Sequence, residues 1–438
     1  MKMKVLVLGS GGREHAIIRT LNKTSSAALK LYCAPGNAGI SEFAQCVPIS
    51  PVDHSALIQF AQSEAIGLTI VGPEAPLAKG IVDEFESNGL SIVGPSRAAS
   101  RLESSKSFAK DFMARNKIPT AGYRVAGSIA EAFGCLRSGE FGSPDSPVVI
   151  KADGLAAGKG VIVANSRAEA ERAVEALMTG DLVDPEAATR VVIEEALQGT
   201  EASILVFSDG RDYALMPPAR DHKRIGENDT GPNTGGMGAI TDVSILDNQM
   251  LDRIVREIVE PALEGARAEG FPFRGVLFVG LMLTSDGPKV LEYNVRFGDP
   301  ETQAILVRLQ TDLLQIFETI TTGKLREMTV EWSDESSACV VLASRGYPGK
   351  YETGIPIAGL DRFSPQDNVE VFHAGTSKSE TGEFLTAGGR VLGVAATGGT
   401  LGTALAQCYG AIEKICWDGM QYRRDIGRFK EASTRASS

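Results

Sequence analysis

Short apolar segments alternate with segments of helical periodicity along the N-terminal part of the chain, and this alternation limits the possible folds more than any other feature. The apolar segments are rich in β-branched residues without polar alternation, and they span 5–8, 29–33, 68–71 and 90–93. Such strands are typical of a sheet covered on both faces. The helical segments between them span 13–23, 54–65 and 79–88. This order predicts a parallel sheet wrapped by helices, in an α/β domain of residues 1–103.

The rest of the chain predicts smaller units of mixed character. Apolar Phe108 and Phe112 indicate a connecting helix, and Ser166 with Glu169 has capping-box spacing at the start of another helix. Further strands are expected at 148–152, 160–164, 276–283, 289–294, 338–343 and 390–396, with a helix at about 301–321. We therefore expect an α/β and α+β multidomain chain. Its remaining domains are a central one of 104–125 and 191–328, an inserted unit of 126–190 and a β-rich one of 329–438.

Charge and apolar content exclude several classes of protein. A net charge of −11 over 438 residues argues against broad attraction to nucleic acid, which requires clustered positive charge. The longest apolar stretch, 275–283, is far shorter than the roughly 20 residues that cross a bilayer. Six scattered cysteines without a C-x-x-C pair are typical of free thiols in a reducing compartment. We expect a cytoplasmic enzyme.

The first glycine cluster, Gly9 to His15, lies where a predicted strand enters a helix, so its amides could hold a phosphate. A dinucleotide-binding motif is one interpretation. It fails because Glu14 occupies the third glycine position and because no acid ends the second strand. A tight structural turn and a site for a phosphorylated small substrate remain, and we favour the second.

A second glycine cluster, Lys151 to Val161, resembles a phosphate-binding P-loop but has the wrong spacing, and Gly160 replaces the required Ser or Thr. The cluster also lies between two predicted strands instead of before a helix. We interpret it as a β-hairpin lid that can close over ATP and exclude water. A hairpin that is merely mobile is the alternative.

Polar side chains, most of them acidic, lie on or at the end of two later predicted strands. Glu292 and Asn294 are two residues apart, so both oxygens leave one face of a strand, as suits a magnesium ion that takes few protein ligands. Arg296 continues this face and could reach a carboxylate or phosphate beside the metal. The second set, Glu194, Glu195 and Glu201, could contact adenine and ribose, although such glutamates often form only a solvated edge.

A long polar segment at 217–238 has too many glycines to form a core, and we expect it to be a functional loop without elements of its own. We expect its backbone amides and Arg220 or Asp221 to bind substrate, with an inert loop as the alternative. His222 is a poor candidate for a metal ligand, since no second histidine is near it in sequence.

Taken together, these motifs resemble the phosphoribosylamine–glycine ligase family of ATP-grasp enzymes. The resemblance runs from Met3 to about Gly427 and rests on the motifs above with three more, Pro35 to Gly39, Val71 to Leu77 and Arg296 to Glu301. It implies an ATP-grasp core with an inserted lid. It also implies that glycine and ATP form a glycyl phosphate, which the amine of 5-phosphoribosylamine captures to give glycinamide ribonucleotide, ADP and phosphate.

The resemblance also implies roles for particular residues. Those expected at ATP are Lys106, Lys151, Gly158, Lys159, Gly160, Glu194, Glu195, Leu197 and Glu201. Those expected at the substrates are Gly11, Gly12, Arg13, Glu14, His15, Asn37, Ala38, Gly39, Glu74, Asp221, Arg296, Gly298 and Asp299. Glu292 and Asn294 would hold Mg²⁺ or Mn²⁺, and Arg296 and Asp221 would act in catalysis. Which of these two contacts glycine is left open.

The expected partners are ATP, glycine and 5-phosphoribosylamine, without nucleic acid or membrane. The chain is taken as a monomer, although the sequence carries no signal for an oligomeric state. Two alternatives stand beside this interpretation. One is another ATP-grasp carboxylate–amine ligase of purine metabolism, such as one that uses formate or bicarbonate. The other is a nucleotide-binding regulator without turnover, against which the intact Glu292, Asn294 and Arg296 argue.

Overall fold

A five-stranded parallel sheet forms the N-terminal unit of the computed structural model, which describes residues 2–156, 160–180, 189–363 and 368–429. The strand order is β3-β2-β1-β4-β5. The strands are β1 Met3–Gly9, β2 Leu29–Pro35, β3 Gln45–Cys46, β4 Leu68–Val71 and β5 Ile92–Val93. The helices are α1 Gly12–Thr24, η1 Ile40–Glu42, α2 His54–Ser63, α3 Glu74–Lys79, α4 Ile81–Ser87 and α5 Arg97–Ser104. The predicted parallel α/β fold is confirmed.

The central strand of this sheet shows why its sequence is apolar throughout. Leu6 and Leu8 pack into one hydrophobic core, whereas Val5 and Val7 pack into another, and all four are fully buried. Successive side chains of a strand point to opposite faces, so a strand covered on both faces needs apolar residues at every position.

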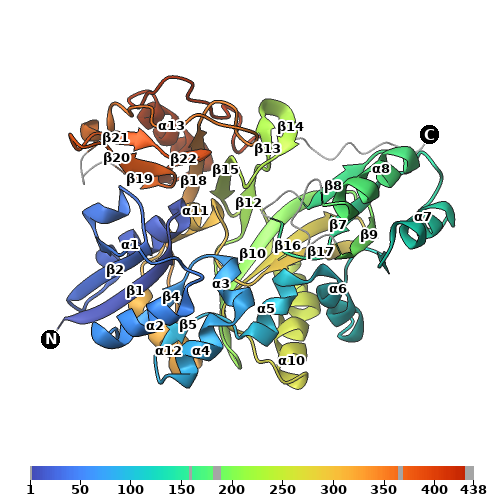
Figure 1. The fold of residues 1–438 in the computed structure, drawn as a ribbon, viewed down its shortest axis with the longest axis horizontal. Helices are drawn as coiled ribbons and strands as arrows, with labels where there is room; N and C mark the ends of the chain where they lie inside the picture. The colour runs from blue at the N-terminus through green and yellow to red at the C-terminus, as the bar shows by residue number, and fades with distance from the viewer. Residues whose placement is uncertain (1, 157–159, 181–188, 364–367, 430–438) are drawn as a thin grey trace.

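The inserted unit has a hydrophobic core of its own and projects from the rest of the molecule, at the right of Figure 1. Its antiparallel sheet has the order β6-β9-β7-β8. Its elements are β6 Tyr123–Ala126, α7 Ile129–Arg137, β7 Val148–Ala152, β8 Val161–Ala164, α8 Arg167–Met178 and β9 Val191–Glu195. Ser166 caps α8 by accepting the amide hydrogen of Glu169, as the capping-box spacing predicts.

A large antiparallel sheet runs through the middle of the molecule in the order β17-β16-β10-β12-β15-β18-β22-β19, with β11 also paired to β10. Its strands are β10 Thr200–Asp209, β11 Tyr213–Leu215, β12 Ala219–Asp221, β15 Gly238–Thr241, β16 Arg274–Thr284, β17 Gly287–Asn294, β18 Ser336–Ala343, β19 Val369–His373 and β22 Arg390–Gly398. Strands β15 and β18 pair with Ile240 opposite Ala338. The β-rich C-terminal segment therefore extends the central sheet through β18, β22 and β19, while its short strands β20 Thr376–Lys378 and β21 Phe384–Thr386 pair with each other in a separate sheet.

Two predicted elements differ in the structure. The helix expected at 301–321 is two helices, α11 Glu301–Leu306 and α12 Leu313–Thr322, because the Asp312 carboxylate accepts the amide hydrogens of Leu314 and Gln315 and starts a new helix. The segment at 217–238 is not without elements. Hairpin strands β13 Arg224–Gly226 and β14 Thr230–Asn233 pair within it, and β12 and β15 border them.

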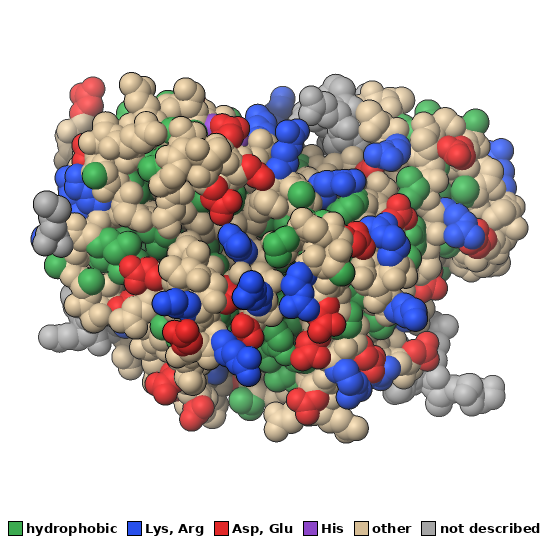
Figure 2. All heavy atoms as spheres, turned by 90° about the horizontal axis from the view of Figure 1, so that it is seen from below, with side chains coloured by type: hydrophobic (Ala, Val, Ile, Leu, Met, Phe, Trp, Pro, Cys, Tyr) green, Lys and Arg blue, Asp and Glu red, His purple; other side chains and the backbone are tan. Residues whose placement is uncertain are grey.

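The remaining elements complete the layers around the sheets in Figure 1. They are α6 Lys106–Arg115, η3 Glu227–Asp229, α9 Asn248–Ile254, η4 Val255–Val259, α10 Glu260–Ala268, η5 Leu325–Glu327, η6 Leu360–Arg362, β20 Thr376–Lys378, β21 Phe384–Thr386 and α13 Leu401–Ile412. None of the helices in the described ranges is long and apolar enough to cross a membrane. Lysine, arginine and acidic side chains lie interspersed on the face shown in Figure 2.

Candidate functional site

Glu292 and Asn294 lie on β17, an edge strand of the central sheet, and both are half-buried. Burial alone would raise the pKa of Glu292. The positive charges of Lys223, Lys151, Lys106 and Arg296 outweigh it and hold the pKa below its usual range. Glu292 is therefore an ionised carboxylate within a ring of cations, and Asn294 adds a neutral oxygen beside it.

This pair of oxygen atoms fits a magnesium ion. Magnesium prefers hard oxygen ligands and is usually held by one or two protein groups, with phosphates and water in its other positions. The described part of the chain contains no cluster of three or more His, Cys, Asp or Glu side chains that could form a full protein cage. The donor set therefore suits an ion that arrives together with phosphates.

Two lysines reach the region of Glu292 from different elements. Lys106 begins α6 and donates to the carbonyl oxygen of Gly154 at 2.9 Å. Lys151, in β7, donates to the carbonyl oxygen of Leu291 at 3.0 Å, immediately before Glu292. Burial lowers the pKa of Lys106. Lys106 and Lys151 are 45 residues apart in the sequence. The fold brings both ammonium groups close to Glu292, on the strand with the candidate metal ligands.

The glycine hairpin between β7 and β8 is anchored by Asp153, a residue that sequence analysis did not single out. Its carboxylate accepts from the Ser107 amide at 3.1 Å and the Ser107 hydroxyl at 2.6 Å, and from the Ser105 hydroxyl at 3.1 Å. Gly160 accepts from the amide of Ala152 at 2.8 Å. Two of the predicted ATP-binding residues, Gly158 and Lys159, lie outside the described residues.

The predicted adenine-binding residues lie where β9 leads into β10. The Glu194 carboxylate is buried and forms ion pairs with Lys110 at 2.9 Å and Lys151 at 3.0 Å, so it faces the protein interior. Glu195 pairs with Lys289 at 3.3 Å, and Leu197 lies half-buried in the following link. These neighbouring glutamates therefore point to different partners.

Asp221, Glu201 and Lys223 form a second charged group beside Glu292. Lys223 Nζ lies 2.9 Å from Glu201 Oε2 and 4.0 Å from Asp221 Oδ1. Burial raises the pKa of Asp221. The buried Glu301 lies near enough that burial, followed by the charge of Asp221, raises its pKa to about 8. Arg220 donates to the backbone oxygen of Glu201 at 2.8 Å and not to a carboxylate of this group.

Arg296 is held by a set of acceptors from three parts of the chain. Its terminal nitrogens lie 3.0 Å from Glu103 Oε1 and donate to Asn294 Oδ1 and to the Phe297 carbonyl, both at 3.1 Å. Its Nε lies 3.5 Å from Glu74 Oε2 and has no hydrogen-bond partner among the described residues. Burial would lower the pKa of Arg296, but Glu103 and Glu74 outweigh it and raise that pKa. The guanidinium is a fixed positive charge whose Nε–H makes no hydrogen bond among the described residues.

The N-terminal glycine cluster is packed tightly against its own helix. Glu14 is buried and accepts from the Gly11 amide and from Arg13 Nε, both at 2.6 Å. A Cβ at Gly72 would lie 2.0 Å from the Glu14 carboxylate, so only glycine fits there. Arg13 also donates to the Phe297 carbonyl at 3.2 Å. Arg13, Glu14 and the equally buried Gly12 are therefore engaged within the protein, and Gly11 is the more accessible.

His15 and the segment 37–39 contact the C-terminal part of the chain. His15 is buried, and its Nδ1 accepts from the backbone amide of His373 at 2.8 Å. Asn37 donates to the carbonyls of Ser10 and His373 at 2.8 Å. The Ala38 amide donates to the Thr376 carbonyl at 3.3 Å, and a Cβ at Gly39 would strike the His373 ring. These predicted substrate residues form a seam between the first and last parts of the chain.

Gly298 and Asp299 lie at the meeting point of the N-terminal, central and C-terminal parts. Asp299 accepts from Arg390 at 2.8 Å and from Gln303 at 2.8 Å. Burial would raise the pKa of Asp299, but Arg390 and Arg13 lower it. A Cβ at Gly298 would lie 2.5 Å from Glu301 Oε2. Arg390, Gln303 and Glu103 were not identified from the sequence, although Gln303 lies only four residues after its partner Asp299.

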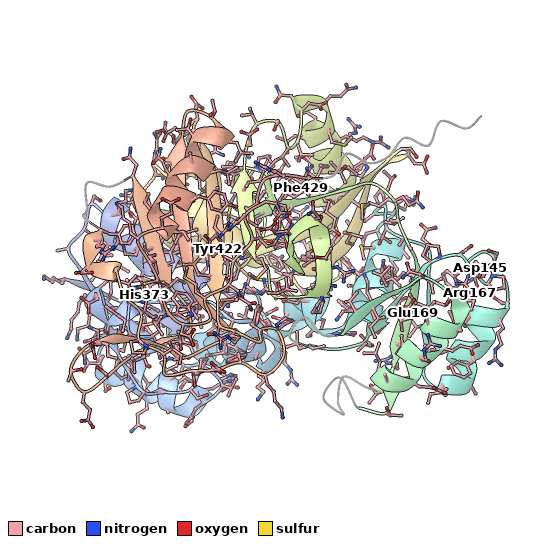
Figure 3. The ribbon with its side chains drawn as sticks, turned by 90° about the horizontal axis from the view of Figure 1, so that it is seen from above. Asp145, Arg167, Glu169, His373, Tyr422 and Phe429 are labelled. Atoms are coloured by element: carbon pink, nitrogen blue, oxygen red, sulfur yellow. The ribbon has the colours of Figure 1, made fainter. Side chains whose placement is uncertain are left out.

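Residues 423–429, at the C-terminal end of the described chain, pack against His222, the residue that follows β12. His222 is buried, accepts from the Gly427 amide at 2.9 Å and stacks on Phe429 at 4.2 Å between ring centroids. Burial and then Arg423 lower the pKa of His222 to about 4, so this ring is neutral. Arg423 is also buried and pairs with Asp229 at 2.8 Å. In Figure 3, Tyr422 and Phe429 lie over the middle of the molecule, far from Arg167 at the end of the inserted unit.

Three family models of phosphoribosylglycinamide synthetase match the chain. The N domain matches residues 3–103, the ATP-grasp (A) domain residues 104–302 and the C domain residues 337–429. A phosphoribosylamine–glycine ligase from Caldanaerobacter subterraneus is 47% identical over 97% of this chain and 99% of its own length. One from Brucella melitensis is 46% identical over 97% of each chain.

Solved structures give the same picture. The crystal structure of a phosphoribosylamine–glycine ligase from Thermotoga maritima is similar with a TM-score of 0.82 and 34% identity, and the match covers 97% of this chain and 100% of that one. The biotin carboxylase domain of Hydrogenobacter thermophilus 2-oxoglutarate carboxylase is similar with a TM-score of 0.73 at 16% identity, covering 96% of this chain and 92% of that one. The second likeness shows the fold alone, and that protein was crystallised with magnesium ADP and bicarbonate.

Proposed function

The chain belongs to the phosphoribosylglycinamide synthetase family of ATP-dependent ligases, and from this premise we propose how its own residues carry out the ligation of glycine to 5-phosphoribosylamine. In this reaction a glycine carboxylate oxygen attacks the γ-phosphorus of ATP and ADP leaves. The amine nitrogen then attacks the carbonyl carbon of the glycyl phosphate, loses a proton and expels phosphate. The products are glycinamide ribonucleotide, ADP and phosphate.

The observation that carries the proposal is the ring of cations around Glu292. Lys106, Lys151, Lys223 and Arg296 all lie near enough to lower the pKa of this half-buried carboxylate. Phosphoryl transfer needs positioning and charge neutralisation more than it needs a covalent nucleophile, and a ring of fixed cations supplies both. We assign Lys106 and Lys151 to the nucleotide phosphates.

Glu292 and Asn294 would hold the magnesium ion. When bound, Mg²⁺ neutralises charge on the phosphate oxygens and orients them for in-line transfer. The protein keeps Glu292 ionised and fixes the position of the Asn294 side-chain oxygen beside it. Arg296 does the second of these, because its guanidinium donates to Asn294 Oδ1 at 3.1 Å. Manganese, which accepts the same oxygen ligands, is expected to substitute.

For the adenosine moiety we assign the link between β9 and β10. Backbone groups around Glu195 and Leu197 would bind the base, and the Glu201 carboxylate would accept from the ribose hydroxyl groups. Glu194 differs from Glu195 and Glu201, because its carboxylate is already shared by two lysines, Lys110 and Lys151. Its part is therefore to hold those lysines.

We assign Arg296 and Asp221 to the two oppositely charged groups of glycine. The unused Nε donor of Arg296 suits the glycine carboxylate, which is the nucleophile of the first step. The Asp221 carboxylate, half-buried and 4.0 Å from Lys223, suits the glycine ammonium group. Each would bind the opposite charge on the same small substrate, so the carboxylate is presented to ATP in a fixed orientation.

For 5-phosphoribosylamine we assign the junction around Gly11, Glu74 and Asp299. Glu74 is partly exposed and its carboxylate can accept from ribose hydroxyl groups. Gly11, at the start of α1, is more accessible than the four residues that follow it and would line this site, while its own amide donates to Glu14. Asp299 is fixed by Arg390 at the meeting point of the three parts of the chain. This side of the junction lies next to Arg296, where the glycyl phosphate would form.

An assay for ADP formation tests the proposal. ADP should form when glycine and freshly prepared 5-phosphoribosylamine are both present with ATP and magnesium, and mass spectrometry should find glycinamide ribonucleotide. Formate and bicarbonate should each fail to replace glycine. ADP formation with either of these and not with glycine would overturn the proposal, as would ATP binding without any turnover.

A variant tests the metal assignment. Glu292→Gln keeps the size of the side chain but removes its charge, so turnover should fall by on the order of 10²-fold even at saturating magnesium. The circular dichroism spectrum should be unchanged. As a matched control, Glu84→Gln alters a glutamate that pairs with His54 in the N-terminal unit and should keep full turnover. Unchanged phosphate release by the Glu292 variant would contradict the assignment.

A further inference from the structure

Lys110 is a buried lysine that the assignments above leave without a role. It lies in α6, one turn after Lys106, and its side chain is only 2% exposed. Its ammonium group cannot reach a bound ligand directly. A buried charge is costly unless it is paired and hydrogen-bonded, so the partners of Lys110 indicate what keeps it there.

Those partners form a closed network between two sheets. Lys110 Nζ lies 2.9 Å from Glu194 in β9 and donates at 2.7 Å to the Thr120 hydroxyl. That hydroxyl donates at 2.7 Å to the carbonyl oxygen of Val290 in β17. Lys151, in β7, completes the circuit through Glu194 at 3.0 Å and the Leu291 carbonyl at 3.0 Å. Strands β7 and β9 belong to the inserted unit, whereas β17 is an edge of the central sheet (Figure 1).

The charge balance of this network favours phosphate. One carboxylate, Glu194, is shared by two lysines, so the group keeps one net positive charge. Lys151 has three N–H donors and uses one of them on the Leu291 carbonyl, while its ammonium group also forms an ion pair with Glu194 at 3.0 Å. If Lys110 were neutral, the whole charge of Glu194 would act on Lys151. The attraction of Lys151 for a phosphate would then weaken.

We propose that Lys110 is a positioning residue for ATP: by sharing the Glu194 carboxylate it leaves the charge and one donor of Lys151 available to the nucleotide, while tying the inserted unit to β17. This proposal rests on the assignment of Lys151 to the phosphates. It gives Lys110 no contact with the substrate. Its effect on ATP therefore depends wholly on Glu194, which makes the two residues energetically coupled.

A lysine-to-methionine substitution tests the proposal, since methionine has nearly the same length without charge. In Lys110→Met, the Michaelis constant for ATP should rise about tenfold, the loss expected for one weakened charge-assisted contact. The constants for glycine and 5-phosphoribosylamine should stay within about twofold of wild type. Calorimetric titration with magnesium ATP, without the other substrates, should give the same loss in affinity. Lys4→Met is the control, because Lys4 also pairs with a glutamate, Glu64, but lies in the N-terminal unit.

The double variant separates positioning from a general loss of structure. In a Glu194→Gln background, Lys110→Met should change ATP affinity by less than about twofold, because no carboxylate remains to be shared. Equal losses in both backgrounds would overturn the proposal. So would a parallel rise in the Michaelis constants of all three substrates, or unchanged ATP affinity in the single variant. The double variant also removes the unpaired buried carboxylate, so it is informative even if the single variant folds poorly.

The pH dependence adds a second measurement. Burial is the main cause that lowers the pKa of Lys110, to about 8, and Lys151 adds to it, while Glu194 and Glu195 oppose it. The ring of Tyr123 lies 5.9 Å from the same ammonium group, and burial raises the Tyr123 pKa to about 12, so the phenol stays neutral. ATP affinity in the wild type should therefore fall as the pH rises through about 8, and this fall should be absent in Lys110→Met. Its persistence in the variant would count against Lys110.

The variant Lys151→Met separates a failure of the Lys110 proposal from a failure of the Lys151 assignment on which it rests. If Lys151→Met does not weaken ATP binding, the assignment of Lys151 is wrong and the proposal for Lys110 falls with it. If Lys151→Met weakens ATP binding but Lys110→Met does not, the proposed function stands and only the role of Lys110 is wrong.

Discussion

Arg296 shows how this site fixes its charges: its cationic head is held by acidic groups from α3 and α5 and by the Asn294 amide. Each of these neighbours stabilises the ionised form and restricts its position. The same residues would meet the substrates, so a substitution can change one binding step without disturbing the fold. The first prediction at this scale uses that property, and the second concerns the neighbouring buried Glu301.

Glu74→Ala should raise the Michaelis constant for 5-phosphoribosylamine by roughly tenfold or more and leave that for ATP nearly unchanged. Glu74 is more exposed than Glu103, which keeps that guanidinium in place without it. Steady-state kinetics with each substrate varied in turn provide the measurement. A rise in the ATP constant, with the 5-phosphoribosylamine constant unchanged, would mean that the residues assigned to these two substrates must be exchanged.

Glu301→Gln should make the protein more stable than wild type at alkaline pH. Burial and the charge of Asp221 raise the pKa of Glu301 from 4.5 to about 8, so the folded state keeps a proton that the unfolded chain has lost. This group therefore lowers the free energy of unfolding as the pH rises from about 4.5 to about 8. Melting temperatures of both proteins between pH 5 and pH 9 should diverge in favour of the variant, then run parallel above about pH 8. A constant difference would show that Glu301 does not titrate in this range.

Local spacing was enough to predict the candidate metal pair, because Glu292, Asn294 and Arg296 sit two residues apart and a strand repeats every two residues. It could not identify Glu103, which is 192 residues from its partner Val295, or Lys110. In sequence, each is an ordinary polar residue of an amphipathic helix. Only the fold places them against buried partners.

At the scale of single elements, the break between α11 and α12 is set by one capping residue. Asp312 accepts the amide hydrogens of Leu314 and Gln315 with one oxygen, and the amide and hydroxyl of Ser26 with the other. The apolar periodicity of 301–321 continues across the break, which explains why a single helix was predicted there. A cap that also binds a distant loop cannot be inferred from periodicity.

Asp312→Ala should cost about 1–2 kcal/mol of the free energy of unfolding, because it removes a helix cap and leaves the Ser26 amide without this acceptor. Urea unfolding of the variant, with the slope of the transition unchanged, gives the value. Asp53→Ala is a matched comparison, since Asp53 caps α2 through the Ala56 amide alone, and it should cost less. An equal or smaller loss at Asp312 would show that the Ser26 contacts contribute nothing.

At the scale of the whole molecule, the central sheet joins parts of the chain that the sequence presents as different. Ile204 and Val206 of β10 pack into one core and Leu205 and Phe207 into the other, so the sheet separates two hydrophobic cores along its length. The change in sequence character near Met328 predicted a separate β-rich domain. The register between β15 and β18 makes the same residues continue the central sheet. Pairing between distant strands leaves no local signal, which is why this continuity was not predicted.

Two tryptophans can report whether these cores unfold together. Trp332 packs against one core and Trp417 belongs to the other. In the single-tryptophan variants Trp417→Phe and Trp332→Phe, urea should therefore give the same midpoint by fluorescence, because one sheet supports both cores. The far-UV signal of each variant serves as the internal reference. Separate midpoints would show that the C-terminal part unfolds on its own.

The contact between Arg423 and Asp229 has a consequence for the order in which the molecule is made. The two residues are 194 positions apart, and the hairpin of β13 and β14 lies beside Asp221 at the candidate glycine site. At the usual 5–20 residues per second, a ribosome delivers Arg423 roughly 10–40 s after Asp229. During this interval the hairpin lacks its buried arginine. A nascent chain can thus complete its nucleotide-binding residues first, whereas the contact of Arg423 with the hairpin beside Asp221 forms only after Arg423 has been synthesised.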